Sequence, residues 1–452
     1  MAERASSGAL AEVAGGEHIG AARSRAMLAS SIGLIAGKLA SVALGFLAWI
    51  VAARLFTAHE VGLAAGAVSA MMLCTQFALL GISSAVIDQF PLHRSRPMLL
   101  LDTSIGLVSI AALIAGGIFL ALAGTVLGEL SVVAEDPLYA SLFLAMCVLG
   151  TVGILFDQIS AALRSGEQVV VRNLVSGAAT VVLIAALPLV GAESSLTIFA
   201  AWTLGGIVMC AVGLLQLWRA LERYRYRPRI SSGLTRSLIR IGLPNYALTL
   251  AERAPGPILP VVVISVLSPT ANAYWYAVWM MAWAAYFVPI SVGLTVFAEA
   301  AQKPESLRSL IPHGIRSSLG IGIAGACVGA LLAEPLLSLL GPAYAAAGTE
   351  PLRILLIGVI PITFVQAYFA ACRAARRLGE AVATGLIGNA VAVLVAALAA
   401  SSDGLVGMAL GWVLAQVVVG AFASWRLVVV LGRSAEPAHV ESGDLATSAA
   451  AR

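Results

Sequence analysis

Two neighbouring charged residues, Glu252 and Arg253, lie inside the apolar stretch YALTLAERAPGPILPVVV, residues 246–263. Lys38 lies in another apolar stretch. It follows Arg25 by 13 residues, just as Arg253 follows Arg240 by 13 residues. At about 1.5 Å per helical residue, both cations are predicted near the middle of a hydrocarbon core about 30 Å thick. A charge there costs about 2.5–3.5 kcal/mol, so we expect these side chains to face a polar interior. Two such cations could bind an anionic substrate, the arginine in fork geometry and the lysine as a point charge.

Each of the two stretches carries one polar stripe at helical spacing. The stripes consist of Ser31, Lys38, Ser41 and Gly45, and of Asn245, Thr249, Glu252 and Gly256. Intervals of three, four and seven residues place side chains on one helix face. We therefore predict a substrate-binding set made of Lys38, Arg253, Glu252, Ser41, Asn245 and Thr249.

A structural alternative stays open for the same charges. Glu252 and Arg253 cannot neutralise each other, because adjacent helical residues point about 100° apart. Lys38 and Glu252 could instead form an ion pair that joins the two halves of the protein or gates them. Arg253 would then be held by backbone carbonyl groups.

Three prolines, Pro255, Pro257 and Pro260, follow the charged pair. Each proline removes a backbone donor and pushes on the carbonyl four residues earlier, so we expect the helix to bend here. Freed carbonyls inside a membrane are tolerated where they line a cavity or meet polar side chains. The bend is either a hinge or a static kink.

The composition indicates an integral membrane protein. Of the 452 residues, 60% are hydrophobic and only 11% are charged, whereas soluble proteins carry about 25% charged residues. The five cysteines form no CxxC pair and the five histidines show no metal spacing, so we expect neither a metal nor a cofactor. No signal peptide is evident in the small, polar first 25 residues.

Twelve segments are long and apolar enough to cross a bilayer. They are residues 26–52, 61–87, 98–124, 139–162, 169–190, 196–218, 241–266, 273–298, 317–340, 352–372, 381–400 and 404–430. Placing both termini and every second loop on one side gives that side 23 of the 27 Lys and Arg residues. The positive-inside rule then predicts cytoplasmic termini.

An internal duplication is indicated by two weak sequence matches. LFDQISAALRSGE (155–167) resembles YFAACRAARRLGE (368–380) at an offset of 213, and RLFTAHEVGLAA (54–65) resembles VLSPTANAYWYA (266–277) at 212. A six-helix unit used twice would give two lobes around a central cavity, which is a transporter architecture. The predicted organisation is a disordered cytoplasmic tail (1–25), an N-lobe (26–218), a basic cytoplasmic linker (219–240), a C-lobe (241–430) and a second tail (431–452).

Several stretches resemble the polysaccharide flippases. ARLFTAHEVGLAAGAVSA is similar to their turn between helices one and two, and IRIGLPNYALTL (239–250) to the start of their second lobe. GPAYAAAGTEPLRILLIGVIP (341–361) and the following LGEAVATGLIGNAVAVLVAALAASSDGLVGMALGW resemble two further stretches of these proteins. The resemblance spans residues 26–430. It favours the superfamily of multidrug/oligosaccharidyl-lipid/polysaccharide exporters, and within it the flippases of the O-antigen type.

This resemblance implies that the protein moves an undecaprenyl-diphosphate-linked oligosaccharide from the inner to the outer leaflet of a bacterial inner membrane. Lys38 and Arg253 would receive the diphosphate, two cations for two phosphates. Expected partners are the lipid-linked anionic glycan, membrane phospholipids and a polysaccharide polymerase or glycosyltransferases, but no nucleic acid. The lipid II flippases of the superfamily have two additional C-terminal helices, which this chain lacks.

Two other functions compete with this interpretation. A multidrug/cation antiporter of the same superfamily needs acidic groups in its cavity, and the first stretch offers Lys38 instead. A membrane glycosyltransferase or polymerase would need a sizeable loop with acidic catalytic residues. The longest outer loop, residues 125–138, offers Glu129, Glu135 and Asp136 in about fourteen residues. We therefore do not expect an enzyme.

Three further features have a structural and a functional interpretation. Trp275, Trp279 and Trp283 share a helix face that could stack on sugar rings, although an interface belt and helix packing are the stronger explanation. The seven arginines between 219 and 240 could bind anionic lipid or simply set the orientation, which we favour. Asp102 and Asp157, near predicted helix ends, are expected to be solvated or capped.

Overall fold

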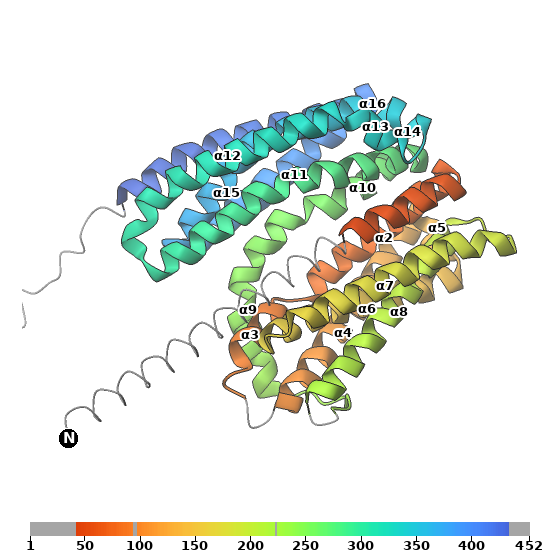
Figure 1. Ribbon diagram of the computed structural model, residues 1–452, viewed down its shortest axis with the longest axis horizontal. Coiled ribbons are helices and arrows are strands. Elements are labelled where there is room, and N and C mark those ends of the chain that lie inside the picture. The colour runs from red at the N-terminus through yellow and green to blue at the C-terminus, as the bar shows by residue number, and fades with distance from the viewer. Residues whose placement is uncertain (1–41, 94–96, 222–223, 434–452) are drawn as a thin grey trace, which may run out of the picture. The chain divides into compact units, whose positions relative to one another are not determined.

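The computed structural model describes residues 42–93, 97–221 and 224–433, and every regular element in these ranges is a helix (Figure 1). Nine of the described helices are long and apolar enough to cross a membrane. The helices α14 (Pro342–Ile357) and α15 (Val359–Ala374) form one further span with a 41° bend. The helix α16 (Leu378–Arg433) is interrupted at Asp403 and Gly404 and so provides two of the predicted spans. With the shorter apolar helix Val42–Leu55, which covers the described part of the predicted span 26–52, the predicted all-α architecture with about twelve spans is confirmed.

The first compact unit contains the described residues up to Tyr246 together with Ser268–Ala273. Its helices, red to yellow-green in Figure 1, are α2 (Ala58–Ala78), α3 (Ile82–Gln89), α4 (Pro97–Val126), α5 (Ser131–Glu135), α6 (Pro137–Ala162), α7 (Gly166–Ala186) and α8 (Ser195–Ala220). Buried aliphatic and aromatic residues of α3, α4, α6 and α8 form its core, among them Ile82, Leu100, Leu155 and Leu217. The start of α9 packs on this unit, and the predicted lobe boundary at residue 240 stays a prediction.

The second unit contains Ala247–Leu267 and the chain from Tyr274 onward. Its helices, green to blue in Figure 1, are α10 (Pro255–Val266), α11 (Pro269–Gln302), α12 (Leu307–Leu331), α13 (Ala333–Ser338), α14, α15 and α16. The helix α9 (Ser232–Arg253) begins in the first unit and ends in the second. The core of the second unit is built mainly by α11, α12, α15 and α16, with Tyr368 and Phe369 fully enclosed.

The duplicated turns have the same backbone geometry. Arg164 follows α6 with φ 58°, and Arg376 follows α15 with φ 57°, so both occupy the left-handed region. In each turn the N–H of the next residue bonds the carbonyl five residues earlier, Ser165 to Ser160 at 2.9 Å and Arg377 to Cys372 at 2.8 Å. This double hydrogen-bonded end is the Schellman motif. The structural offset is 212, one residue less than the offset that the sequence letters suggested.

Two close approaches hold α9 and α11 onto α2 and α3 in the first unit. The Tyr246 hydroxyl donates to the Gln76 carbonyl oxygen at 2.6 Å, and Gly242 lies against the backbone of Gly81. At the other end of α2, the Asn272 side-chain amide donates to the Gly62 carbonyl oxygen at 2.8 Å. Two segments near the unit boundary therefore pack on the first unit, namely the part of α9 up to Tyr246 and the start of α11.

Replacing Gly62 with Ala is expected to destabilise the protein by about 1–3 kcal/mol, because the new Cβ would overlap the carbonyl oxygen of Pro269. Thermal unfolding of the purified protein in detergent should show a midpoint several degrees lower. Gly117→Ala in α4 is the control, since no heavy atom lies within 4 Å of the added Cβ. An equal change in both variants would contradict a specific close approach at Gly62.

Candidate functional site

The predicted binding residues fall into two groups. Lys38 and Ser41 lie outside the described residues, so their predicted roles stay predictions. Asn245, Thr249, Glu252 and Arg253 all lie in the second half of α9. The chain carrying these residues from Ala247 onward belongs to the second unit.

The proline cluster coincides with the end of α9. This helix ends at Arg253, and α10 begins at Pro255, where the missing backbone donor is tolerated in the first helical turn. Ala254 connects the two helices, donating to the Leu250 carbonyl at 2.9 Å and accepting from the Ile258 N–H at 3.1 Å. Ala254 itself has helical backbone angles, so the predicted bend and its use as a hinge stay predictions.

Glu252 has a partner that the sequence did not indicate. Its Oε2 accepts a hydrogen bond from Arg373 Nη2 of α15 at 3.0 Å. The two side chains are only 10% and 8% exposed, so the pair is largely removed from solvent. From the sequence, Lys38 was the expected partner of Glu252 if the charges formed an ion pair. In the described residues, the ion pair of Glu252 joins α9 to α15 within one unit.

Amide side chains of α16 fasten the same turn of α9. Asn389 Nδ2 donates to the Ala251 carbonyl oxygen at 2.8 Å, and Gln416 Nε2 donates to Asn389 Oδ1 at 3.1 Å. Asn389 lies before the break at Gly404 and Gln416 after it, so both halves of α16 contribute. Asn389 and Gln416 could have been noticed in the sequence as polar residues inside apolar helices. Their contacts could not have been predicted, because Asn389 lies 27 residues from Gln416 and 138 residues from Ala251.

Arg253, unlike the adjacent Glu252, is not buried. Its side chain is exposed, and within the described part of the chain it forms no ion pair. Arg373 balances the charge of Glu252, so the three charged side chains together carry one net positive charge. An exposed guanidinium inside an apolar span can bind an anion through charge-assisted hydrogen bonds.

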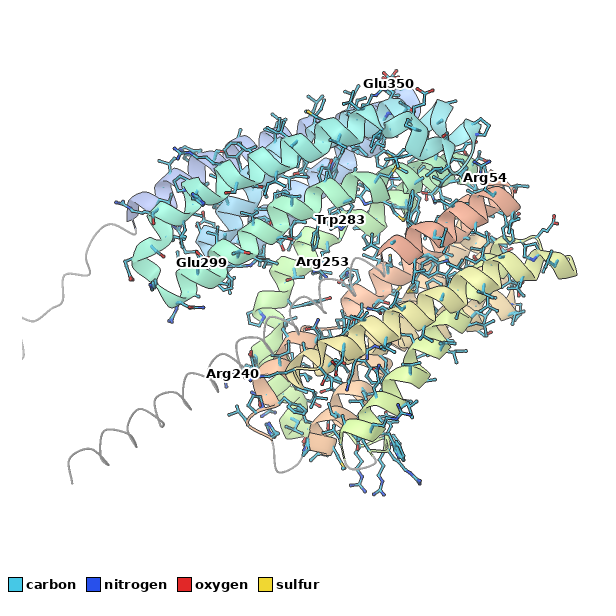
Figure 2. The ribbon with its side chains drawn as sticks, in the orientation of Figure 1. Arg54, Arg240, Arg253, Trp283, Glu299 and Glu350 are labelled. Carbon is cyan, nitrogen blue, oxygen red and sulfur yellow. The ribbon has the colours of Figure 1, made fainter. Side chains whose placement is uncertain are left out.

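An aromatic side chain lies at the level of Arg253. A Cβ on Gly256 of α10 would be 3.4 Å from Trp279 Nε1 of α11, so these residues face each other. The two helices run antiparallel across a short turn, which brings Arg253, one turn before Gly256, to the level of Trp283, one turn after Trp279. Figure 2 labels both Arg253 and Trp283 in this part of the second unit. Trp283 is half-buried.

The remaining tryptophans of this face are packed inside the second unit. Trp275 is fully buried and stacks on Trp279 with ring centroids 5.9 Å apart. Trp412 of α16 contacts Trp279 edge-on at 5.3 Å. Helix packing, which the sequence analysis preferred, therefore accounts for Trp275 and Trp279, whereas a membrane-interface position does not account for the buried Trp275.

The two aspartates expected to be solvated or capped are engaged in long-range contacts. Asp157 forms an ion pair with Arg172 at 2.5 Å, and Arg172 is 1% exposed. Gln216 of α8 accepts from the same guanidinium at 2.6 Å. Asp102 is buried at 4% exposure and holds the chain between α8 and α9. The sequence expectation was wrong for Asp102, because the segment that covers it lies more than 120 residues away.

Comparison with known proteins gives a match by structure. No protein-family model matches the chain, and no curated protein matches it by sequence. An inward-facing multidrug resistance MATE family transporter of the MOP superfamily superposes with a TM-score of 0.68, at 14% identity, over 87% of this chain and 96% of that one. An outward-facing conformation of such a transporter matches with a TM-score of 0.63, at 15% identity, over 90% and 96% of the two chains.

The chain has the fold of a MOP superfamily transporter. A third MOP structure comes from Pyrococcus furiosus, and there a reversed polarity of the binding pocket suggested a different function. It matches with a TM-score of 0.60, at 15% identity, over 91% of this chain and 96% of that one. This fold agrees with the two units and with a multi-pass membrane topology. At 14–15% identity it does not identify the substrate, which depends on the side chains of this protein.

Proposed function

We propose that the protein is a transporter that flips an undecaprenyl-diphosphate-linked oligosaccharide from the inner to the outer leaflet by alternating access of its two lobes. The observation that carries this proposal is Arg253. It is an exposed guanidinium within an apolar span, while the only carboxylate beside it in sequence, Glu252, is already paired with Arg373. This arrangement leaves a net positive charge to bind a diphosphate.

Trp283 supports a substrate that combines an anion with a sugar. An indole face offers apolar contact to a sugar ring, and Arg253, at the same level of the helix pair, offers hydrogen bonds to phosphate oxygens. Lys38 remains the proposed second cation. Outward movement of an anion also agrees with a membrane potential that is negative inside, since each negative charge gains about 2.3 kcal/mol per 100 mV.

Multidrug export is the second candidate, because the matched MATE structures are described as multidrug resistance transporters. Glu252 is the residue that would receive a cationic drug. It would first have to be released from Arg373, and removing a partner from a buried ion pair leaves an uncompensated charge. This requirement makes the anionic substrate the better match to the side chains.

Deleting the gene is expected to cause one undecaprenyl-linked species to accumulate several-fold on the cytoplasmic face, as measured by mass spectrometry of extracted lipid intermediates. Complementation with the intact gene should remove that accumulation. Drug susceptibility of the same strains is the parallel measurement. Raised susceptibility with a normal pool of lipid-linked glycan would instead identify a multidrug transporter.

A further inference from the structure

The chain between α8 and α9 is held against the start of α4 rather than forming a loose connection. Residues 224–231 have no regular secondary structure, yet they make specific contacts. The Tyr224 hydroxyl donates to Asp102 Oδ1 at 2.7 Å, and the backbone N–H of Arg227 donates to the same oxygen at 3.1 Å. One buried carboxylate therefore fixes both a side chain and the backbone of this segment.

A second set of contacts continues along the same face of α4. The Thr103 hydroxyl donates to the Arg229 carbonyl oxygen at 3.4 Å and accepts from the Ser231 N–H at 3.3 Å. One turn later, Gly106 lies against the segment, and a Cβ there would be 3.5 Å from the hydroxyl oxygen of Tyr226. The segment 224–231 is thus fastened along its length.

The Tyr224 hydroxyl keeps its proton at neutral pH. Burial is the main cause that raises the pKa of Tyr224, and the hydrogen bond to the Asp102 carboxylate raises it further. The phenol therefore stays protonated and continues to donate at neutral pH. Asp102 is only 4% exposed, and buried polar groups in proteins normally form hydrogen bonds. The two hydrogen bonds that its carboxylate accepts offset the cost of burying it.

Tyr224 and Tyr226 lie against α4, and Arg225, Arg227 and Arg229 alternate with them in the sequence. All three arginines are exposed. Within the described part of the chain, none of them forms a salt bridge.

The side chains beside these arginines suit the border of a membrane. Trp218 at the end of α8, Tyr226 and Ile230 are 40%, 39% and 50% exposed. Aromatic side chains are enriched at the level of lipid headgroups, where one end is apolar and the other is wet. Setting the orientation of the protein would require only the charges, without a fixed backbone. The fixed backbone and the exposure of all three arginines therefore need a further explanation.

We propose that Arg225, Arg227 and Arg229 form a binding site for the headgroups of anionic phospholipids at the predicted cytoplasmic border of the first unit. The phosphodiester of such a lipid accepts charge-assisted hydrogen bonds from the guanidinium groups, while its acyl chains lie along the apolar side chains. This site is separate from Arg253 and does not depend on the identity of the transported substrate.

Native mass spectrometry of the full-length protein tests the proposal with phosphatidylglycerol and phosphatidylcholine as probes. The unmodified protein should bind phosphatidylglycerol more tightly than phosphatidylcholine. Arg225→Gln/Arg229→Gln should weaken phosphatidylglycerol binding about 30-fold, because each arginine near an anionic headgroup contributes about 1 kcal/mol, and should leave phosphatidylcholine binding unchanged. The preference should also fall as salt is raised.

The matched control is Lys303→Gln/Arg316→Gln, which removes the same charge from exposed positions of the second unit. We expect it to change phosphatidylglycerol binding less than about threefold. An equal loss in both double variants, or no loss in the first, would overturn the proposal. Thermal unfolding of each variant verifies that the protein is folded.

Asp102→Ala separates a built site from a simple excess of charge. It keeps every arginine and makes the protein more positive, but it removes the acceptor for Tyr224 and Arg227. We expect phosphatidylglycerol binding to weaken about tenfold despite the added positive charge. Unchanged or tighter binding would show that the fastened segment is not part of the site. If Asp102→Ala does not fold, Tyr224→Phe provides the same comparison with a smaller expected loss.

Discussion

Arg253→Gln is expected to slow export of the lipid-linked oligosaccharide about 10- to 150-fold, with the protein remaining folded. A charge-assisted hydrogen bond contributes about 1.5–3 kcal/mol, and each 1.4 kcal/mol corresponds to a factor of ten. Because Arg253 is exposed and has no ion pair within the described residues, its loss should change stability by less than about 0.5 kcal/mol. The measurement is the accumulation of the undecaprenyl-linked species in cells that carry only the variant.

Arg240→Gln is the matched control for this prediction. Arg240 is also an exposed arginine of α9, thirteen residues before Arg253, and Figure 2 labels both. It should export at the normal rate. Arg253→Lys should retain part of the activity, because it keeps the charge but loses the two-pronged geometry. Normal export by Arg253→Gln would refute the assignment of this residue to the substrate.

Arg373→Ala is expected to destabilise the protein by about 3–5 kcal/mol. Removing one partner of a buried ion pair leaves the other charge uncompensated, and Glu252 is only 10% exposed. Thermal or denaturant unfolding in detergent should show the loss clearly. Arg316→Ala, at an exposed position of α12, should change stability by less than about 0.5 kcal/mol.

The double variant Glu252→Met/Arg373→Met distinguishes a structural pair from a functional one. Replacing both partners with apolar residues of similar volume is often neutral or stabilising, so most of the lost stability should return. If the pair only joins α9 to α15, this variant should also export substrate, because Arg253 is intact. A stable double variant that fails to export would indicate that Glu252 or Arg373 takes part in transport or gating.

The transmembrane segments could be predicted because they depend on local properties. A run of about 20 apolar residues predicts a span wherever the rest of the chain lies. Pro255 begins α10 directly after the junction with α9, while the bend predicted from the proline cluster stays a prediction. The break at Gly404 also coincides with the predicted end of one span and start of the next.

The offset between the two repeats could not be fixed from residue identity alone. The repeated Arg-x-Gly-Glu pattern suggested an offset of 213, whereas the equivalent backbone positions, Arg164 and Arg376, give 212. Two arginines follow each other at 376 and 377, so side-chain identity could not decide which one is equivalent to Arg164. The left-handed backbone conformation and its hydrogen bonds decide it.

The sequence by itself determined that Glu252 and Arg253 lie within a membrane-spanning segment, and that so costly a pair must be satisfied there. Only the tertiary structure decided how: Glu252 pairs with Arg373, 121 residues away, while Arg253 stays exposed. It likewise decided that Asp102 is covered by Tyr224, 122 residues later. Helical periodicity and hydropathy are set by neighbours in sequence, whereas the partner of a buried charge is set by which helices meet when the chain folds.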